Sequence, residues 1–282
     1  MYNGLVLSGG GSKGLLQLGL LEALYENKKI EKIKYLAGCS VGSLLCVLLA
    51  VGYTPVEIIT YFCVNDFSTL LKGSNVLLIT SHCGLIDCNV LLEYLEKMVM
   101  EKLQYIPTFE DLYNKYGITF ICPSYKINHK KDEDPCVYFS YRTHPKMHIT
   151  KAACLSSNIP IVFTKTGYNN DYYIDGGVFD NFPVNKLIDD IVNDPWNEDI
   201  EYKIIGIKFE KDVDSLEIKT FFDYVKHLFL AVTKELKYTD NNTNVKILSI
   251  KTGLSAVDFD IENKRKIDLF IEGKATYKNF FK

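Results

Sequence analysis

A serine at the centre of a glycine-flanked turn is the residue of this chain best suited to act as a nucleophile. Ser40 lies in Gly38-Cys39-Ser40-Val41-Gly42, between an apolar run typical of a strand and a longer one typical of a helix. This order is that of a nucleophile elbow, a tight strand-to-helix turn that aims a serine hydroxyl at its substrate. Glycines are expected at 38 and 42 because a side chain there would block the turn or crowd the helix against the strand. Matches to so short a pattern also arise by chance, so other motifs must support it.

A second glycine cluster, near the N-terminus, is suited to holding negative charge. An apolar strand-like run leads into the segment Gly9-Gly10-Gly11-Ser12-Lys13-Gly14, and a helix-like run follows. The segment matches the dinucleotide-binding pattern Gly-x-Gly-x-x-Gly, but the next strand ends without the carboxylate that would hold a ribose. It is not a P-loop either, because no Gly-Lys-Ser/Thr is present. What remains is a nest of backbone N–H groups at a helix N-terminus, which beside an elbow serine would form an oxyanion hole.

An aspartate is a better candidate than a histidine for the base that such a serine needs. Of the five histidines, only His227 comes late enough for the chain order serine, acid, histidine. It lies on a stretch with helical spacing, where a histidine is more often solvated than catalytic. Asp175 ends a strand-like run and is followed by Gly176 and Gly177, which allow a sharp turn. Asp-Gly is also a common plain turn, so this motif alone does not identify a catalytic group.

The three motifs together resemble the patatin-like phospholipases, a family of lipid acyl hydrolases with a Ser–Asp dyad. The segment 9–14 matches the glycine-rich oxyanion motif with its basic residue, 38–42 matches the elbow, and 175–177 matches the Asp-Gly-Gly/Ala motif. Further segments fall in the order expected for the family, so that the resemblance covers most of the first 185 residues: 84–87, 107–112, 152–160 and 181–184. Cys39 stands where the family often has a small hydroxyl residue.

The resemblance implies a role for each motif. Ser40 would attack an ester carbonyl while Asp175 takes its proton directly, with no histidine between them. The N–H groups of Gly10 and Gly11, with Gly9 adjacent, would stabilise the oxyanion, and such donors contribute about 3–4 kcal/mol each in other hydrolases. Lys13 would place positive charge near a phosphate or the oxyanion, or is a solvated lysine in the first helical turn. The supporting glycines are Gly14, Gly38, Gly42, Gly176 and Gly177.

The elements that must position these residues alternate between strand-like and helix-like runs. This alternation predicts an α/β fold with a mainly parallel central sheet flanked by helices on both faces. The resemblance implies that this three-layer fold is patatin-like. We expect one domain over residues 1–282, with the motifs in about 1–190 and a C-terminal strand and helices in 200–282. The predicted strands are 3–8, 33–38, 118–123, 136–140, 171–175 and 203–209. The predicted helices are 14–27, 42–52, 55–63, 89–103, 183–193, 217–237 and 262–279.

Composition and charge narrow the possible partners. A net charge of −3, without a basic stripe carrying interleaved aromatics, argues against nucleic acid. Eight cysteines without regular spacing fit neither a zinc site nor a disulfide framework, and no calcium loop stands out, so we expect no metal and no cofactor. With no signal peptide and no run of about 18 apolar residues, we expect an intracellular, cytoplasmic protein that contacts membranes peripherally.

Two further apolar segments have alternative interpretations. The stretch 61–82 lies between two predicted helices, and its part 64–82 either forms a mobile flap over an acyl-binding site or packs in the core. In the predicted helix 262–279, Ile267, Phe270 and Ile271 recur at helical spacing and face either a membrane or the protein. We favour packing against the protein for this helix.

Three functions are compatible with the motifs. The first is a phospholipase A-type hydrolase that cleaves fatty-acyl esters of glycerophospholipids. The second uses the same dyad on other esters, as a thioesterase, an esterase or a triacylglycerol lipase. The third is a lipid-binding scaffold that has lost the chemistry, and the presence of Ser40, Asp175 and the glycine cluster argues against it.

Overall fold

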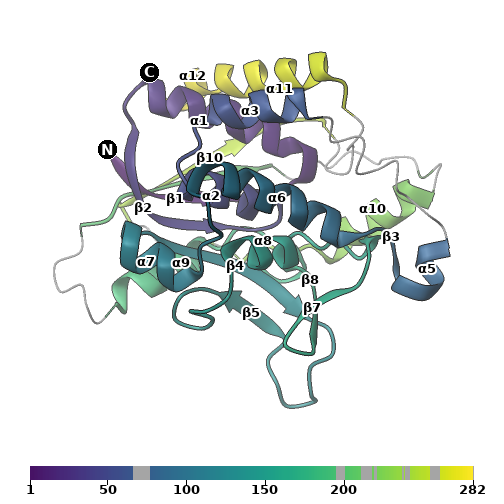
Figure 1. Ribbon diagram of the computed structural model, residues 1–282. Helices are drawn as coiled ribbons and strands as arrows, with labels where there is room; N and C mark the ends of the chain where they lie inside the picture. The colour runs from purple at the N-terminus through teal and green to yellow at the C-terminus, as the bar shows by residue number, and fades with distance from the viewer. Residues whose placement is uncertain are drawn as a thin grey trace.

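An eight-stranded sheet lies at the centre of the molecule and is flanked by helices, as predicted from the alternation of strands and helices (Figure 1). The computed structural model describes residues 1–65, 77–194, 201–210, 218, 221–236, 238, 242–254 and 261–281. Along the sheet the strands are β10 (Val245–Ile250), β9 (Ile204–Phe209), β1 (Tyr2–Leu7), β2 (Ile30–Gly38), β4 (Thr119–Lys126), β8 (Asp171–Asp175) and β7 (Thr166–Tyr168), with β5 (Cys136–Phe139) also paired to β4. Two short strands, β3 (Gly84–Ile86) and β6 (Ile161–Phe163), pair separately.

The α-helices of the described residues pack on this framework. They are α1 (Gly14–Glu26), α2 (Val41–Ala50), α3 (Pro55–Val64), α5 (Leu77–His82), α6 (Cys88–Leu103), α7 (Phe109–Tyr116), α8 (Ile149–Ser156), α9 (Val184–Val192), α10 (Phe221–Val232), α11 (Asn263–Ala275) and α12 (Tyr277–Phe280). Two of them begin at capping boxes, Thr54 with Glu57 for α3 and Thr108 with Asp111 for α7. Such reciprocal bonds satisfy N–H groups that the first helical turn leaves without partners.

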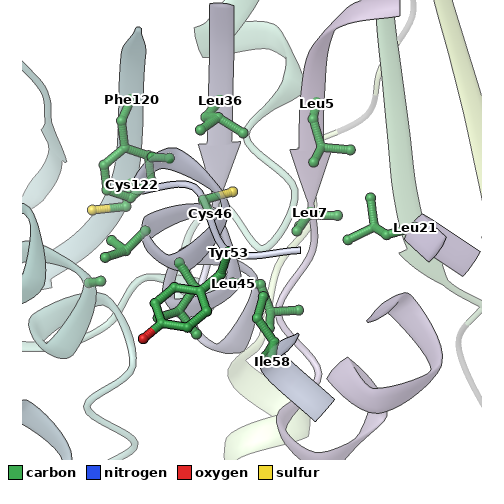
Figure 2. Close-up of a cluster of buried hydrophobic side chains, with 14 of the residues drawn as sticks. Leu5, Leu7, Leu21, Leu36, Leu45, Cys46, Tyr53, Ile58, Phe120 and Cys122 are labelled. Carbon is green, nitrogen blue, oxygen red and sulfur yellow. The ribbon is translucent and has the colours of Figure 1, made fainter. Parts of the chain in front are cut away.

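The two faces of the sheet bury different residues because side chains alternate along a strand. On one face Leu5, Leu7, Leu36 and Phe120 join the largest hydrophobic cluster, to which several helices contribute (Figure 2). On the other face Val6, Ala37 and Ile121 pack with residues of α9, including Val184, Leu187 and Ile191. The molecule therefore has the three predicted layers, with helices, sheet and helix in succession.

The register of the sheet decides which loops meet. Pairing is parallel from β10 through β9, β1 and β2 to β4, and Leu7 at the end of β1 lies opposite Gly38 at the end of β2. The loops that follow β1 and β2 therefore leave the sheet side by side, at the edge where parallel sheets bind ligands.

The far side of the sheet is antiparallel and brings a third loop to the same edge. β8 pairs antiparallel with β4, and Asp175 lies opposite Ser124. Ala37 of β2 pairs with Ile121 of β4, so Ser124 is as far beyond that pair as Ser40 is. The end of β8 and the turn after β2 therefore lie at the same height on the sheet.

Most predicted elements are confirmed. The strand β10, the short strands β3, β6 and β7, and the helices α5, α7 and α8 were not predicted as elements. The predicted helix 262–279 is divided into α11 and α12 at Thr276. Of the proposed flap at 64–82, residues 66–76 lie outside the described residues, and Leu77–His82 forms α5.

The packing predicted for the C-terminal helix is correct for Phe270 but wrong for two isoleucines. Ile267 and Ile271 are exposed, whereas Leu269 is fully buried. The helix packs through Leu269 and through a close backbone contact, since a Cβ on Gly273 of α11 would overlap the Leu16 carbonyl oxygen of α1. Glycine allows the two helix backbones to approach closely, and this contact decides which face of α11 is buried.

No single helix of the described residues has the length and hydropathy of a membrane span. Only α2 and α3 taken together pass such a test, and they are bent by 115° at their junction.

Candidate active site

Ser40 occupies a strained turn between β2 and α2. Its φ is 51° and its ψ −128°, a conformation that non-glycine residues rarely adopt. The close approach of α2 to the sheet requires the two flanking glycines: a Cβ on Gly38 would lie 2.5 Å from the Gly42 carbonyl carbon, and one on Gly42 would overlap the Leu7 carbonyl oxygen. The Ser43 hydroxyl donates to the Ser40 carbonyl at 2.6 Å and helps to hold the turn. Such strain is characteristic of functional turns.

The glycine loop after β1 lies directly beside this turn. The Gly9 N–H donates to the Asn181 carbonyl oxygen at 3.1 Å, so this group of the predicted oxyanion hole is already used. Within the described part of the chain, the N–H groups of Gly10 and Gly11 have no hydrogen-bond acceptor. Gly11 has a φ of +53°, and α1 begins three residues later. Two free N–H groups at the start of a helical segment form a site for negative charge.

Asp175, the last residue of β8, is fully buried next to the serine turn. Its Oδ1 accepts the Gly177 N–H at 2.8 Å and the Cys39 thiol at 3.8 Å. Its backbone N–H donates to the Asn158 carbonyl oxygen at 2.9 Å. These contacts fix the carboxylate from three different elements.

Burial raises the pKa of Asp175 from 3.8 to about 6. The nearby Ser40 hydroxyl, the Gly177 N–H and the Cys39 thiol oppose this rise because they stabilise the carboxylate. Among the described residues, Oδ2 has no partner at normal hydrogen-bond geometry, so the Ser40 hydroxyl is near the carboxylate without a well-formed bond to it. Such bonds are often long in ligand-free sites and tighten when substrate binds.

A cavity of about 170 Å³ opens beside Ser40. Its wall combines the glycine loop and the start of α1 with α2, α3, β3, α6, β6 and the beginning of α11. The apolar residues of the wall include Leu15, Leu44, Leu45, Leu91 and Phe163. An acyl chain suits such a lining, and no histidine is present among the described residues of the wall.

Three motif residues take structural positions. The Lys13 ammonium lies 5.7 Å from the centre of the Phe209 ring, and Lys13 is not part of the cavity wall. A Cβ on Gly14 would lie 2.6 Å from Val41 Cγ2, so this glycine lets α1 pack against α2. A Cβ on Gly176 would overlap the Pro123 carbonyl oxygen, which explains a glycine directly after Asp175.

Sequence reasoning missed three residues that organise the site. Cys39 bonds Asp175, and Asn158 donates from Nδ2 to the Tyr173 carbonyl oxygen at 2.7 Å. The Asn181 side chain contacts both the N-terminal glycine loop and the Asp-Gly-Gly turn. A Cβ on Gly9 would overlap its Oδ1, and a Cβ on Gly177 would lie 3.0 Å from the same atom. Asn158 and Asn181 fall in the segments 152–160 and 181–184, so their place in the order of motifs was the available signal.

A second buried carboxylate, Asp180, lies close to the site. Burial raises its pKa to about 6, and a 2.7 Å hydrogen bond from the Tyr138 hydroxyl partly offsets the rise. Asp180 also accepts the Phe182 N–H at 3.3 Å. Its bonds to Tyr138 and Phe182, with none to Ser40, support the turn between β8 and α9.

Comparison with known proteins agrees with this arrangement. A sequence model described as patatin-like phospholipase matches residues 5–188, well over half of the chain, and the chain belongs to this family. The matched region holds the serine turn, the glycine loop and Asp175.

Particular relatives are found among viruses. The chain is 37% identical over 198 residues to the probable lipid hydrolase 463L of Invertebrate iridescent virus 6, a match covering 66% of this chain and 63% of that protein. It is 28% identical to protein R571 of Acanthamoeba polyphaga mimivirus, over 94% of this chain and 89% of that one. The chain thus spans less than two thirds of the first of these relatives.

Solved structures share the fold at low sequence identity. ExoU of Pseudomonas aeruginosa, in its complex with SpcU, has a TM-score of 0.60 at 18% identity, over 99% of this chain and 51% of that one. VipD of Legionella pneumophila has a TM-score of 0.50 at 16% identity, over 99% of this chain and 66% of that one.

Proposed function

We propose that this protein is a phospholipase A-type acyl hydrolase in which Ser40 is the nucleophile and Asp175 the general base. The observation that carries the proposal is the meeting of a strained, cavity-lining serine with a fully buried carboxylate beside two free backbone N–H groups. A pKa of about 6 suits Asp175 to this role, because the group is mainly ionised at neutral pH and is more basic than an ordinary aspartate.

The chemistry follows the usual two steps of a serine hydrolase. Asp175 takes the hydroxyl proton as Ser40 Oγ bonds to the acyl carbonyl carbon, and the oxyanion accepts hydrogen bonds from Gly10 and Gly11. The ester C–O bond then breaks, and the leaving alkoxide takes the proton from Asp175. In the second step Asp175 takes a proton from water, whose oxygen bonds to the acyl carbon. The bond between that carbon and Ser40 Oγ then breaks, Oγ takes the proton back from Asp175, and the fatty acid leaves.

The exposed face of α10 supports a membrane as the source of substrate. Val225 and Phe229 pack on the β3–β6 side, in a cluster with Ile86 and Phe163, which also line the cavity. Turned away from that cluster, Phe221, Tyr224 and Leu228 are about half exposed. Apolar side chains gathered on one face of a surface helix are typical of contact with a lipid interface.

Turnover of a fluorogenic phospholipid in vesicles and of a short soluble ester tests the proposal. The wild type, Ser40→Ala and Asp175→Asn are assayed side by side with chelator present. We expect wild-type turnover of the phospholipid and its loss in both variants. A preference for the soluble ester would favour a general esterase with the same dyad. A folded wild type inactive on both substrates would reject the proposal in favour of a lipid-binding scaffold.

A further inference from the structure

Lys266 is the only charged residue among the described residues that line the cavity, and its place there is unusual. Its side chain is only 5% exposed. The ammonium donates to the Phe62 carbonyl oxygen and to Asn263 Oδ1, both at 3.0 Å. Both acceptors are neutral, and Lys266 forms no ion pair with a carboxylate of the described residues. A buried charge normally has a counter-charge, since burying it alone is costly.

The helix dipole adds to the positive potential at Lys266. Lys266 falls in the first turn of α11, after the N-cap residue Glu262. Of its charged neighbours, Arg265 is paired with Glu272 at 2.6 Å, and Lys264 is exposed. The helix dipole disfavours cations at this end and attracts anions. An ammonium has three donors, and the third of Lys266 has no acceptor within the described ranges. This end of α11 is therefore suited to an anion that enters the cavity.

Part of the role of Lys266 is structural. Phe62 lies near the C-terminal end of α3, where a cation is favourable. The neighbouring Asn263 also donates from Nδ2 to the Cys63 carbonyl oxygen at 2.8 Å. Since Asn263 holds this end of α3 by its own bond, loss of the Lys266 charge leaves the junction of α3 and α11 partly held.

We propose that Lys266 binds the phosphate of the phospholipid substrate while the acyl chain fills the apolar part of the cavity. This inference rests on the proposed function and extends it to the choice of substrate. Within a glycerophospholipid, the phosphodiester is the group with a fixed negative charge; acyl chains and neutral acylglycerols have none. Lys266 would therefore separate phospholipids from neutral lipid esters that share the same acyl chains.

Binding of uncleavable lipids tests the inference independently of hydrolysis. The probes are a short-chain dialkyl ether phosphatidylglycerol and the dialkylglycerol that lacks its phosphate, with affinities measured by calorimetry. Lys266→Met keeps a long apolar side chain without charge, Lys266→Arg keeps the charge, and Lys264→Met removes an exposed charge from the same turn. We expect Lys266→Met to weaken binding of the phospholipid roughly tenfold and leave that of dialkylglycerol unchanged. Lys266→Arg should restore most of the affinity, and Lys264→Met should behave as wild type.

Other outcomes overturn the inference. If Lys266→Met weakens binding of both probes equally, Lys266 only supports the junction of α3 and α11. If it weakens binding of neither probe, Lys266 does not take part in lipid binding. If Lys266→Met instead relieves inhibition by a free fatty acid and leaves phospholipid binding unchanged, the anion is the product carboxylate. Absence of esterase activity in the wild type would reject the proposed function, while the ether-lipid binding would still decide the role of Lys266.

Discussion

Replacement of Asp175 by asparagine should abolish activity and at the same time stabilise the fold. Asparagine has nearly the same shape, and its Oδ1 can still accept the bonds from Gly177 and Cys39. It cannot take a proton from Ser40, so turnover should fall to the level of Ser40→Ala. What the substitution removes is a carboxylate that is fully buried and whose pKa is raised from 3.8 to about 6.

The size of the stabilisation follows from this pKa. Each pKa unit corresponds to about 1.4 kcal/mol, so the difference of about two between 3.8 and about 6 corresponds to about 3 kcal/mol. Below the pKa that Asp175 has in the unfolded chain, the carboxyl is protonated in both the folded and the unfolded state, so its burial does not lower the free energy of unfolding. As pH rises from about 4 to about 6 the unfolded chain ionises first, so the native state loses stability, and above the folded pKa the loss is constant. The advantage of Asp175→Asn should therefore grow from near zero at about pH 4 to about 3 kcal/mol at about pH 7.

Urea denaturation of both proteins at these two pH values measures the difference, and comparison of the pair cancels the titration of other groups. Asp180→Asn is a matched control, because that carboxylate is also buried with a pKa of about 6 but bonds Tyr138 and Phe182 and not Ser40. It should gain stability with the same pH dependence and keep most of its activity. For the wild type, turnover should fall about tenfold from pH 7 to pH 5, as the ionised fraction of Asp175 drops. A less stable Asp175→Asn at pH 7, together with wild-type activity that does not change below pH 6, would refute the reasoning.

Further predictions concern the turn, the helix contacts and the membrane face. Ser40→Gly should have a free energy of unfolding about 1–3 kcal/mol higher than Ser40→Ala in urea denaturation, because glycine accepts the φ of 51° without strain. Equal stabilities of the two variants would argue against a strained turn. Gly42→Ala should destabilise the protein by about 1–3 kcal/mol or more in the same assay, since its Cβ would overlap the Leu7 carbonyl oxygen. Leu228→Glu on α10 should weaken vesicle binding roughly tenfold in a sedimentation assay, whereas Val192→Glu, an exposed position on α9, should not; equal effects would reject α10 as the membrane face.

The glycines and the polar residues beside them made the three loops of the site predictable from the sequence: the glycine loop, the serine turn and the turn after Asp175. Gly38 and Gly42 are recognisable because a tight turn against a strand excludes side chains, and the structure has those close contacts. The strands β1 and β2 were predictable in the same way, as short apolar runs before glycine loops, whereas the parallel strand β10 was not predicted. That both loops leave the same sheet edge follows from parallel pairing, a general property of such folds.

What could not be predicted depends on contacts between distant parts of the chain. The position of Asp175 depends on antiparallel pairing of β8 with β4, which no local pattern reveals. The engagement of the Gly9 N–H depends on Asn181, 172 residues further along the chain. The burial of Lys266 depends on the packing of α11 against α1 and α3, and a lysine followed by an isoleucine in a polar helix gives no local sign of it.

The region matched by the family model ends at residue 188, yet Ile261 and Lys266 belong to the cavity wall. On the proposals made above, the groups that break the ester bond lie within the matched region, whereas the charge that selects the lipid lies beyond it. On the same proposals, a substitution in the last third of the coding sequence can change which lipid is accepted without altering the groups that break the bond. Among related proteins, we therefore expect the residues after 188 to vary more than the residues of the serine turn, the glycine loop and the turn after β8.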